Sequence, residues 1–441
     1  MMATISQARS FERPVQLLFL NQFTINIGFY MLMPYLAAHL SGDLGLAAWL
    51  VGLVLGVRNL TQQGMFLIGG TLADRLGYKR LIVAGCTLRT VGFALLGFVD
   101  SLPALIVASA LTGFAGALFN PAVRAYLAHD AGQRRTEAFA VFNVFYQAGI
   151  VIGPLLGVLL TGISFQLTCT VAAAVFAGLT VLQARALPDR RPERSDPGTT
   201  GFSVLTDWRA VSANRGFLLF SLAMIGSYVL SFQVYLVLPL QIRRLAPDEH
   251  SATLGVGALF VVSGVLAVAT QVRITAWCRR RWSPGQAITR GLALMGVAFT
   301  PLLLADLLAP TSGPAGAATG SRSWPGLALV FMPVLAAAVI LTLATLIVYP
   351  FEMDTIVNLS GNRLVATHYG LYSTVSGIGI TAGNLATGAA LDTADTWNTP
   401  ALPWLALSIL GVACAWAIHR LSCAGLLTLG PPPKTPLRMP S

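Results

Sequence analysis

Eleven residues between two apolar stretches decide the fold, and they read Gly70-Thr-Leu-Ala-Asp74-Arg75-Leu-Gly77-Tyr-Lys79-Arg80. The apolar stretches on either side, at 47–72 and 81–99, are each long enough to cross a membrane as a helix. The glycines permit a tight turn and the close approach of neighbouring helices. We therefore predict a short charged turn at a membrane surface, with one acidic side chain framed by two glycines.

The composition indicates that most of the chain faces lipid. Of the 441 residues, 55% are hydrophobic and 10% are charged, and the mean hydropathy is +0.71, whereas about a quarter of a soluble domain is charged. Apolar stretches of ~20 residues, the length of a membrane-spanning helix, recur along the whole chain. They lie near residues 15–40, 47–72, 81–99, 104–128, 138–162, 165–185, 216–240, 251–274, 286–308, 325–350, 367–391 and 401–423.

A polar interval divides these stretches into six and six. It carries Pro188, Pro192 and Pro197 and several charged residues between 189 and 196, a composition that cannot pack a core. The segments Pro121–Arg134 and Pro350–Arg363 recur at one interval in the two halves. We predict an all-α integral membrane protein with 12 transmembrane helices in two pseudo-symmetric six-helix bundles. The predicted parts are an N-terminal bundle at 1–187, a cytoplasmic central linker at 188–215, a C-terminal bundle at 216–426 and a disordered cytoplasmic tail at 427–441.

The net charge of +11 follows the topology and does not indicate nucleic-acid binding. Of the 28 Lys and Arg residues, 22 fall in the two tails and in the alternate loops that share their side. Only Arg243, Arg244 and Arg322 fall on the opposite side. Because basic residues accumulate on the cytoplasmic side, we predict that both termini are cytoplasmic and that the protein lies in the cell inner membrane.

Several other classes of protein are disfavoured. The five cysteines form no CxxC pair or Cys/His cluster, so neither a disulfide framework nor a metal site is expected. Residues 1–14 contain no short apolar core before a small-residue cleavage site, so we expect no removable signal peptide. No G-x-x-x-x-G-K-[ST] stretch is present, so energy is expected from an ion gradient, and no cofactor is expected.

The charged turn resembles the loop signature of the major facilitator superfamily, G-x-L-A-D-R-x-G-x-[RK]-[RK], which it matches from Gly70 to Arg80. The resemblance implies that Asp74 lies against the amino-terminal end of helix 11, and that Arg75 or Lys79 pairs with Asp130. Both contacts would hold the cytoplasmic side closed. Ordinary surface charges would explain the basic residues but not the framed Asp74, so we favour a gate.

Helix 5 carries a second motif, with three glycines on one face and a proline that removes a backbone donor. Its residues are Gly149, Gly153, Pro154 and Gly157. The motif resembles the G-x-x-x-G-P-x-x-G-G signature of facilitator antiporters, with Val158 in place of the last glycine; a generic packing face is the alternative. Gly56–Asn59, Gln62–Gly64 and Tyr228–Pro239 further resemble the MdtH-like branch of the twelve-helix drug:proton antiporters.

Polar side chains inside the membrane are costly, so each one suggests a cavity or an interhelical hydrogen bond. The candidates for a substrate cavity lie on helices 1, 2, 3, 5 and 7. They are Gln22, Asn26, Tyr30, Arg58, Asn59, Arg89, Asn143, Tyr146, Gln147, Tyr228, Ser231 and Tyr235. A guanidinium group facing that cavity would favour anionic or zwitterionic cargo.

Carboxylates that could carry a proton are few. Glu352 and Asp354 follow Pro350 in helix 10, where a partly buried carboxyl can be protonated reversibly; solvated loop charges are the alternative. The repeat interval places Arg124 of helix 4 opposite Met353, between the two acids. We therefore predict a switchable salt bridge from Arg124 to one of them.

These features favour a secondary active transporter that exports a small amphipathic compound in exchange for protons, by alternating access around a site near the membrane midplane. Proton-coupled uptake or lipid translocation by the same fold is the alternative. A membrane receptor or enzyme is disfavoured, because neither a catalytic cluster nor a large external domain is evident. We expect a monomer in membrane lipid whose partners are its substrate and protons.

Overall fold

The computed structural model describes residues 2–190, 204–308 and 324–427. Within these ranges every regular element is a helix. Residues 309–323, between two of the predicted spans, lie outside the described residues, as do nearly all of the predicted tail at 427–441 and the linker positions 191–203.

The helices of the first half follow one another through short turns. They are α1 (Met2–Arg9), α2 (Arg13–Ala38), α3 (Ala48–Gly64), α4 (Phe66–Leu76), α5 (Tyr78–Phe98), α6 (Leu102–Ala131), α7 (Arg135–Thr161) and α8 (Phe165–Ala186). Gly77 joins α4 to α5 with a φ of 96°, a conformation that glycine adopts without a steric penalty.

The second half follows the linker helix α9 (Val204–Ala213). Its helices are α10 (Arg215–Ala223), α11 (Ile225–Phe232), α12 (Val237–Leu245), α13 (Glu249–Arg281), α14 (Pro284–Val297), α15 (Thr300–Leu308), α16 (Trp324–Ser360), α17 (Val365–Trp397) and α18 (Leu402–Cys423). At the start of α13, Asp248 caps the helix, and hydrogen bonds from Ser251 hold the pKa of that carboxyl below its usual range.

Twelve spans follow from these elements. By length and hydropathy alone, nine segments of the described residues can cross a membrane. One of them, Leu102–Thr161, has 60 residues and contains both α6 and α7, which makes ten. The α3–α4 pair is missed because each piece is shorter than 18 residues, and α17 because it is rich in glycine, serine and threonine. Adding these two gives twelve.

Three predicted spans are interrupted. The span at 47–72 breaks at Met65, and that at 286–308 breaks between α14 and α15. The span at 216–240 consists of α10, α11 and α12. Pro239, in the first turn of α12, has no N–H to donate to the Tyr235 carbonyl, and the Gln233 side chain donates to the Val229 carbonyl at 2.7 Å. Hydropathy predicts the length of a span. It does not show where a proline or a side-chain hydrogen bond replaces a backbone hydrogen bond of the helix.

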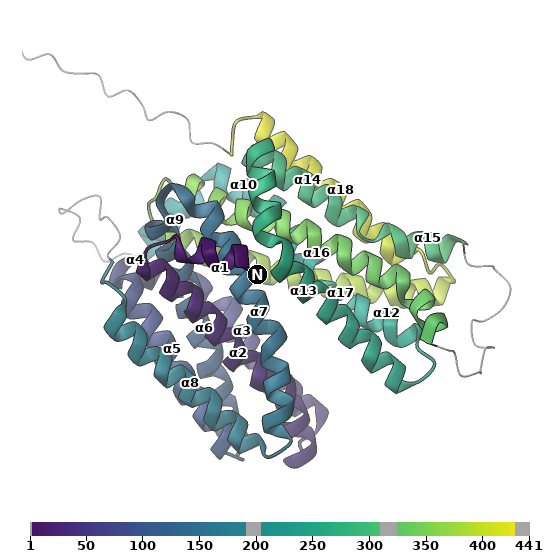
Figure 1. Cartoon of the computed structure of the whole chain (residues 1–441), viewed down its shortest axis with the longest axis horizontal. Coiled ribbons are helices and arrows are strands. Elements are labelled where there is room, and N and C mark those ends of the chain that lie inside the picture. Colours follow the sequence, from purple (N-terminus) through teal and green to yellow (C-terminus); the bar gives the residue numbers. More distant parts are fainter. Residues whose placement is uncertain (1, 191–203, 309–323, 428–441) are drawn as a thin grey trace, which may run out of the picture.

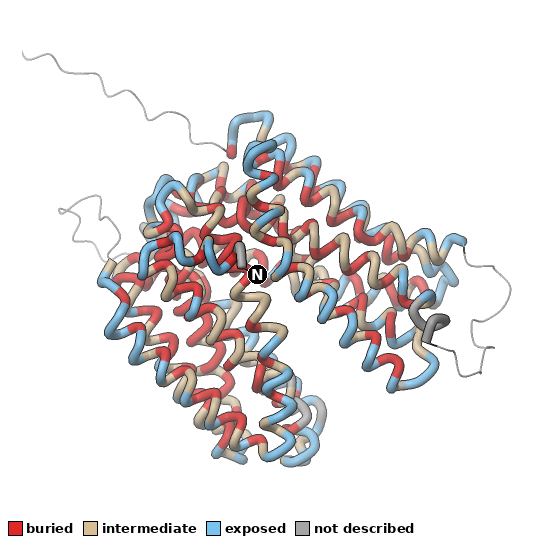
Figure 2. Tube along the Cα trace, in the orientation of Figure 1, coloured by how far each residue is buried: buried red, intermediate tan, exposed pale blue. Residues whose placement is uncertain are grey.

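The helices gather in two bundles, α2–α8 and α10–α18, which meet at one end and diverge towards the other (Figure 1). We call the end where they meet the closed end; it carries α1, α9 and the turns after α4, α6, α13 and α16. Figure 2 shows buried residues along the inside of each bundle and where the bundles meet. Large apolar side chains such as Leu159 and Val412 stay exposed on the outer faces, as a lipid-covered surface requires.

Candidate functional site

The Asp74 carboxylate joins the two bundles at the closed end. It accepts hydrogen bonds from the backbone N–H of Ala366 (3.1 Å) and of Thr367 (2.7 Å) and from the Thr367 hydroxyl (2.7 Å). These donors lie in the first turn of α17, where the helix dipole favours a negative charge. Asp74 is only 6% exposed, so the contact is shielded from water. The location that the resemblance implied for Asp74 is present in the structure.

Two glycines allow α4 and α17 to approach closely enough for this contact. A Cβ atom at Gly70 would collide with the carbonyl oxygen of Ala366. A Cβ atom at Gly370, one turn further along α17, would collide with the carbonyl oxygen of Phe66. Because both obstacles are backbone atoms, a larger residue cannot be accommodated by a side-chain rotation.

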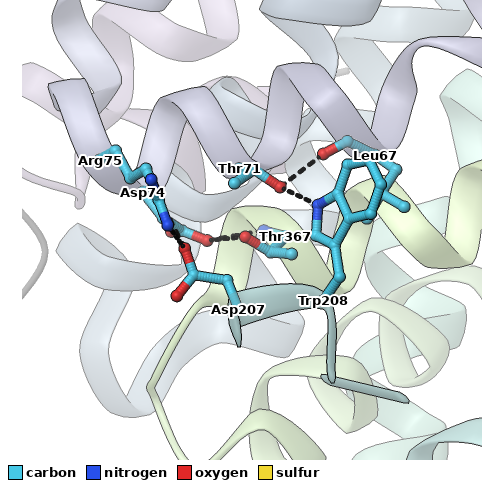
Figure 3. A network of polar contacts seen from close by, with 7 residues as sticks. All are labelled: Leu67, Thr71, Asp74, Arg75, Asp207, Trp208 and Thr367. Carbon is cyan, nitrogen blue, oxygen red and sulfur yellow. Dashed lines mark hydrogen bonds and ion pairs between the residues drawn. The ribbon is translucent and has the colours of Figure 1, made fainter. Parts of the chain in front are cut away.

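Linker helix α9 covers the same region (Figure 3). The Arg75 guanidinium pairs with Asp207, with Nη2–Oδ2 at 2.6 Å and Nε–Oδ2 at 2.8 Å. The Trp208 indole N–H donates to the Thr71 hydroxyl at 2.9 Å. Val211 on the same helix is 1% exposed. The composition of 188–215 predicts a linker that packs no core, but residues 204–213 form a helix that packs against α17 and α10.

Asp130 has other partners than those that the resemblance implied. Its carboxylate pairs with Arg190 at 3.2 Å and with His129 at 2.7 Å, whereas Arg75 pairs with Asp207. Lys79 is partly buried and Arg80 is exposed. The implied Arg75–Asp130 or Lys79–Asp130 pair is therefore not formed in this conformation.

The helix 5 motif lies on α7, and its glycines contact α2. Cβ atoms at Gly149 and Gly153 would come within 2.6 Å and 2.7 Å of Asn26 Cβ and Tyr30 Cβ. At Gly157 the obstacle is the Met31 carbonyl oxygen. The helix continues through Pro154, whose carbonyl accepts a hydrogen bond from the Tyr35 hydroxyl at 2.8 Å. The motif thus holds α2 and α7 in close contact.

Glu352 of α16 is buried, at 3% exposed. The Tyr372 hydroxyl of α17 donates to its Oε1 at 2.5 Å, and Tyr228 of α11 is a second hydroxyl partner. Arg124 of α6 lies near enough to act on Glu352 electrostatically, but its Nη1 donates to the Ser373 hydroxyl at 3.2 Å. One acid of the second half therefore faces one base of the first half.

Asp354 belongs to a different set of contacts, nearer the closed end. It accepts a hydrogen bond from the Thr136 hydroxyl of α7 at 2.9 Å. Next to it, Arg135 donates to Asn362 at 2.9 Å. No ion pair joins Arg124 to either acid within the described ranges, so the predicted salt bridge is not formed in this conformation.

Several cavity candidates are used for helix packing. Asn26 donates to the Gln22 carbonyl one turn earlier (2.6 Å), and Ser231 bonds the Tyr228 carbonyl (3.2 Å). Asn143 of α7 donates to the Gln271 side chain of α13 at 2.6 Å, which ties the two halves together. Gln271 was not singled out from the sequence, although a glutamine inside an apolar stretch is a usable signal.

Aromatic side chains line the region between the halves. Tyr30 of α2 contacts Tyr146 of α7, and Tyr235 of the second half lies close to both. Tyr235 is 47% exposed and stacks on Phe260, with ring centroids 5.7 Å apart. Gln147, next to Tyr146, is also partly exposed. These residues form an amphipathic surface that would suit an amphipathic ligand.

The remaining cavity candidates gather on one side of Tyr30. Arg58 donates to the side-chain oxygens of Asn59 and Gln62, each at 2.8 Å. Arg58 and Arg89 both lie over the ring of Phe29, at 4.5 Å and 5.2 Å from its centroid. Two basic groups therefore share one aromatic ring inside the first bundle.

Comparison with known families agrees with this geometry. A family model described as Major Facilitator Superfamily matches residues 18–384, which include Asp74 and its partners on α17. The chain belongs to the major facilitator superfamily. The resemblance drawn from the charged turn and the twelve-helix fold class are thereby confirmed.

Similar members of the superfamily cover nearly the whole chain. An uncharacterised MFS-type transporter of Mycobacterium tuberculosis, Rv0849, is 50% identical over 413 residues, 94% of each chain. The multidrug resistance protein MdtH of Photorhabdus laumondii is 28% identical over 420 residues, covering 95% of this chain and 96% of that protein. MdtH of Sodalis glossinidius is likewise 28% identical, over 421 residues.

Membership in the major facilitator superfamily decides the broad biochemical class. The chain is a multi-pass membrane transporter of small molecules, and it is not an enzyme. Transporters of this superfamily use no cofactor, since an ion gradient is a driving force and not a bound group. The resemblance to the MdtH-like branch is confirmed by the relatives of that name.

Proposed function

We propose that this transporter exports a small amphipathic compound in exchange for protons, by alternating access. The relatives named multidrug resistance protein favour export of drugs or toxic metabolites, and thereby a role in antibiotic resistance. The basic residues of the turns gather at the closed end, including Arg75, Arg134 and Arg279. By the positive-inside rule this end and both termini are cytoplasmic, and the membrane is the cell inner membrane.

The observation that carries the proposal is the position of Glu352. Its carboxyl is buried, its partners are hydroxyl groups, and it faces Arg124 of the other half. A hydroxyl can donate to a carboxylate and accept from a carboxylic acid, so both protonation states of Glu352 can be accommodated. Proton uptake would remove the attraction to Arg124 and loosen the contact between halves.

Alternating access would use contacts between the halves at two places, the closed end and the Asn143–Gln271 hydrogen bond. In the conformation described, Asp74 and α9 hold the closed end, while the bundles diverge at the opposite end, from which a proton would reach Glu352. Release of the Asp74 contact would let the halves rock about the Asn143–Gln271 region. The protein would act as a monomer, because each half supplies one side of the pathway.

The proposal is tested in two steps. A growth-inhibition panel of neutral, zwitterionic, anionic and cationic antibacterial compounds is run in pump-deficient cells with and without the protein. The compound with the largest shift is then loaded into proteoliposomes that contain a pH-sensitive dye. We expect protons to enter as the compound leaves when the outside is made acidic. Export is overturned if no compound shifts growth and none moves protons.

Glu352→Gln should uncouple transport from protons. We expect the variant to ignore an imposed pH gradient while it still exchanges labelled compound across the membrane, because substrate binding and rocking remain. Asp306→Asn is the matched control. The Asp306 carboxyl is partly buried and accepts a hydrogen bond from an aromatic side chain, the Trp404 indole, at 2.7 Å, but it lies in α15. A wild-type response of Glu352→Gln to the gradient would remove Glu352 from the coupling mechanism.

A further inference from the structure

Two guanidinium groups lie together inside the first bundle. The Cζ atom of Arg58 is 4.5 Å from the centroid of the Phe29 ring, and that of Arg89 is 5.2 Å from the same centroid. Arg89 also lies 5.6 Å from the centroid of Phe176. Arg58 is near the middle of the α3–α4 span and Arg89 near the middle of α5, so neither charge reaches a membrane surface.

These two charges have no acidic partner among the described residues. The hydrogen-bond acceptors of Arg58 are the neutral amides of Asn59 and Gln62. Arg89 is 6% exposed, and the Nε atoms of both arginines are buried without a hydrogen-bond partner. The acids of the first half lie near the helix ends, for example Asp74 and Asp130. No ion pair thus compensates the two positive charges within the described residues, and the hydrogen bonds of Arg58 go to neutral groups.

Internal contacts alone do not explain this arrangement. A cation over an aromatic ring is stabilised only weakly, and this gain is smaller than the cost of burying an ion away from water. The two guanidinium groups are also close enough to repel each other. An anion bound between or beside them would remove both penalties, and a guanidinium fork suits a carboxylate or phosphate.

The arginine pair borders the region between the halves. Tyr30 follows Phe29 in the chain and lies close to Arg58. Tyr30 in turn contacts Tyr146 and lies near Tyr235 of the second half. Arg58 is partly exposed and its neighbour Asn59 is exposed. A ligand between the halves can therefore reach Arg58 with a charged group while its apolar part lies on the tyrosines.

We propose that Arg58 and Arg89 bind the anionic group of an amphipathic substrate, a carboxylate, sulfonate or phosphate, and that Tyr30, Tyr146 and Tyr235 hold its apolar part. The inference rests on the proposed transport function and adds the charge class of the substrate. Arg58 contacts the anion, and Arg89 adds the second positive charge behind it. The same chemistry would hold the headgroup of an anionic lipid.

The experiment compares two probes that share one ring system and differ in charge, 2-naphthoate and 2-naphthylmethylammonium. Binding to the full chain in nanodiscs of zwitterionic lipid is measured by equilibrium dialysis. We expect naphthoate to bind at least tenfold more tightly than the cation. Arg58→Gln and Arg89→Gln should each weaken naphthoate binding about tenfold or more. Equal binding of the two probes, or unchanged binding to Arg58→Gln, would overturn the proposal.

Two further measurements test whether the effect of Arg58→Gln is specific to anion binding. Arg290→Gln is the control, because its guanidinium also lies over an aromatic ring, Trp282, at 4.6 Å, but in the second half; naphthoate binding should be unchanged. Arg58→Gln should not lower the melting temperature without ligand, since it relieves repulsion from Arg89, whereas a purely structural arginine would lower it. If the Arg89→Gln variant does not fold, the proposal is tested by naphthoate binding to the Arg58→Gln variant alone, because Arg58 is partly exposed.

Two variations of the experiment distinguish a lipid headgroup from a soluble anion, and the anion-binding proposal from the proposed antiport. Phosphatidylglycerol in the nanodiscs should displace naphthoate if a lipid headgroup is the natural anion, and should leave binding unchanged if a soluble substrate is. Binding is measured without a proton gradient. Naphthoate binding without proton-coupled transport therefore overturns only the proposed antiport, and proton-coupled transport with no preference for anions overturns only this inference.

Discussion

At the scale of single residues, Gly70 sets how closely α4 approaches α17. A methyl group there would meet the Ala366 carbonyl, a backbone atom that cannot turn away. Overpacking of this kind costs about 1–3 kcal/mol, and Gly70→Ala should shift the balance towards separation of the bundles at the closed end by about 5–150-fold. The measurement is labelling of Thr136→Cys, at the cross-half contact, by an impermeant maleimide in a Cys423→Ser background.

Gly64→Ala is the control for Gly70→Ala. Gly64 ends α3 in the same span, but a Cβ atom there meets nothing within 4 Å. Its labelling rate should equal that of the parent. Equal rates for both variants would show that the Gly70 approach does not hold the closed end.

At the scale of elements, α9 is a clamp on the closed end. Its ion pair to Arg75 is partly exposed and contributes up to about 1 kcal/mol, and the Trp208–Thr71 hydrogen bond contributes about as much. Asp207→Asn and Trp208→Phe should each raise the labelling of Thr136→Cys by roughly two- to fivefold. Trp397→Phe, at an exposed tryptophan, should have no effect. If α9 does not hold the closed end, Thr136→Cys should be labelled at the same rate in all three variants.

The same elements show what the sequence could predict. Hydropathy located α2 and α7 within a few residues, because lipid exposure imposes a composition on a whole helix. The motif at Gly70–Arg80 predicted the contact of Asp74 with the start of α17. The Asp207 partner of Arg75 could not be predicted, because 132 residues separate them and a surface ion pair needs no distinctive pattern. Nor could the repeat interval place Arg124 on Ser373, since it aligns backbones and not side-chain rotamers.

At the scale of the whole molecule, the proposed alternating access requires the two bundles to separate at the closed end. Arg135 and Asn362 lie on opposite bundles there, with their side chains 2.9 Å apart, and neither belongs to the proposed coupling or binding residues. Joining Arg135→Cys to Asn362→Cys with a cleavable bifunctional methanethiosulfonate should stop transport completely. A reducing agent should restore it. Naphthoate binding should persist in the cross-linked protein, because the opposite end still admits the probe.

A cross-link within one half is the necessary comparison. Ser10 and Arg134 both belong to the first half, and their side chains are 2.9 Å apart. Joining Ser10→Cys to Arg134→Cys in the same way leaves the bundles free to separate, so transport should continue. If the Arg135–Asn362 cross-link also left transport intact, the substrate pathway could not pass between the bundles at the closed end. Movement would then have to occur within a single bundle.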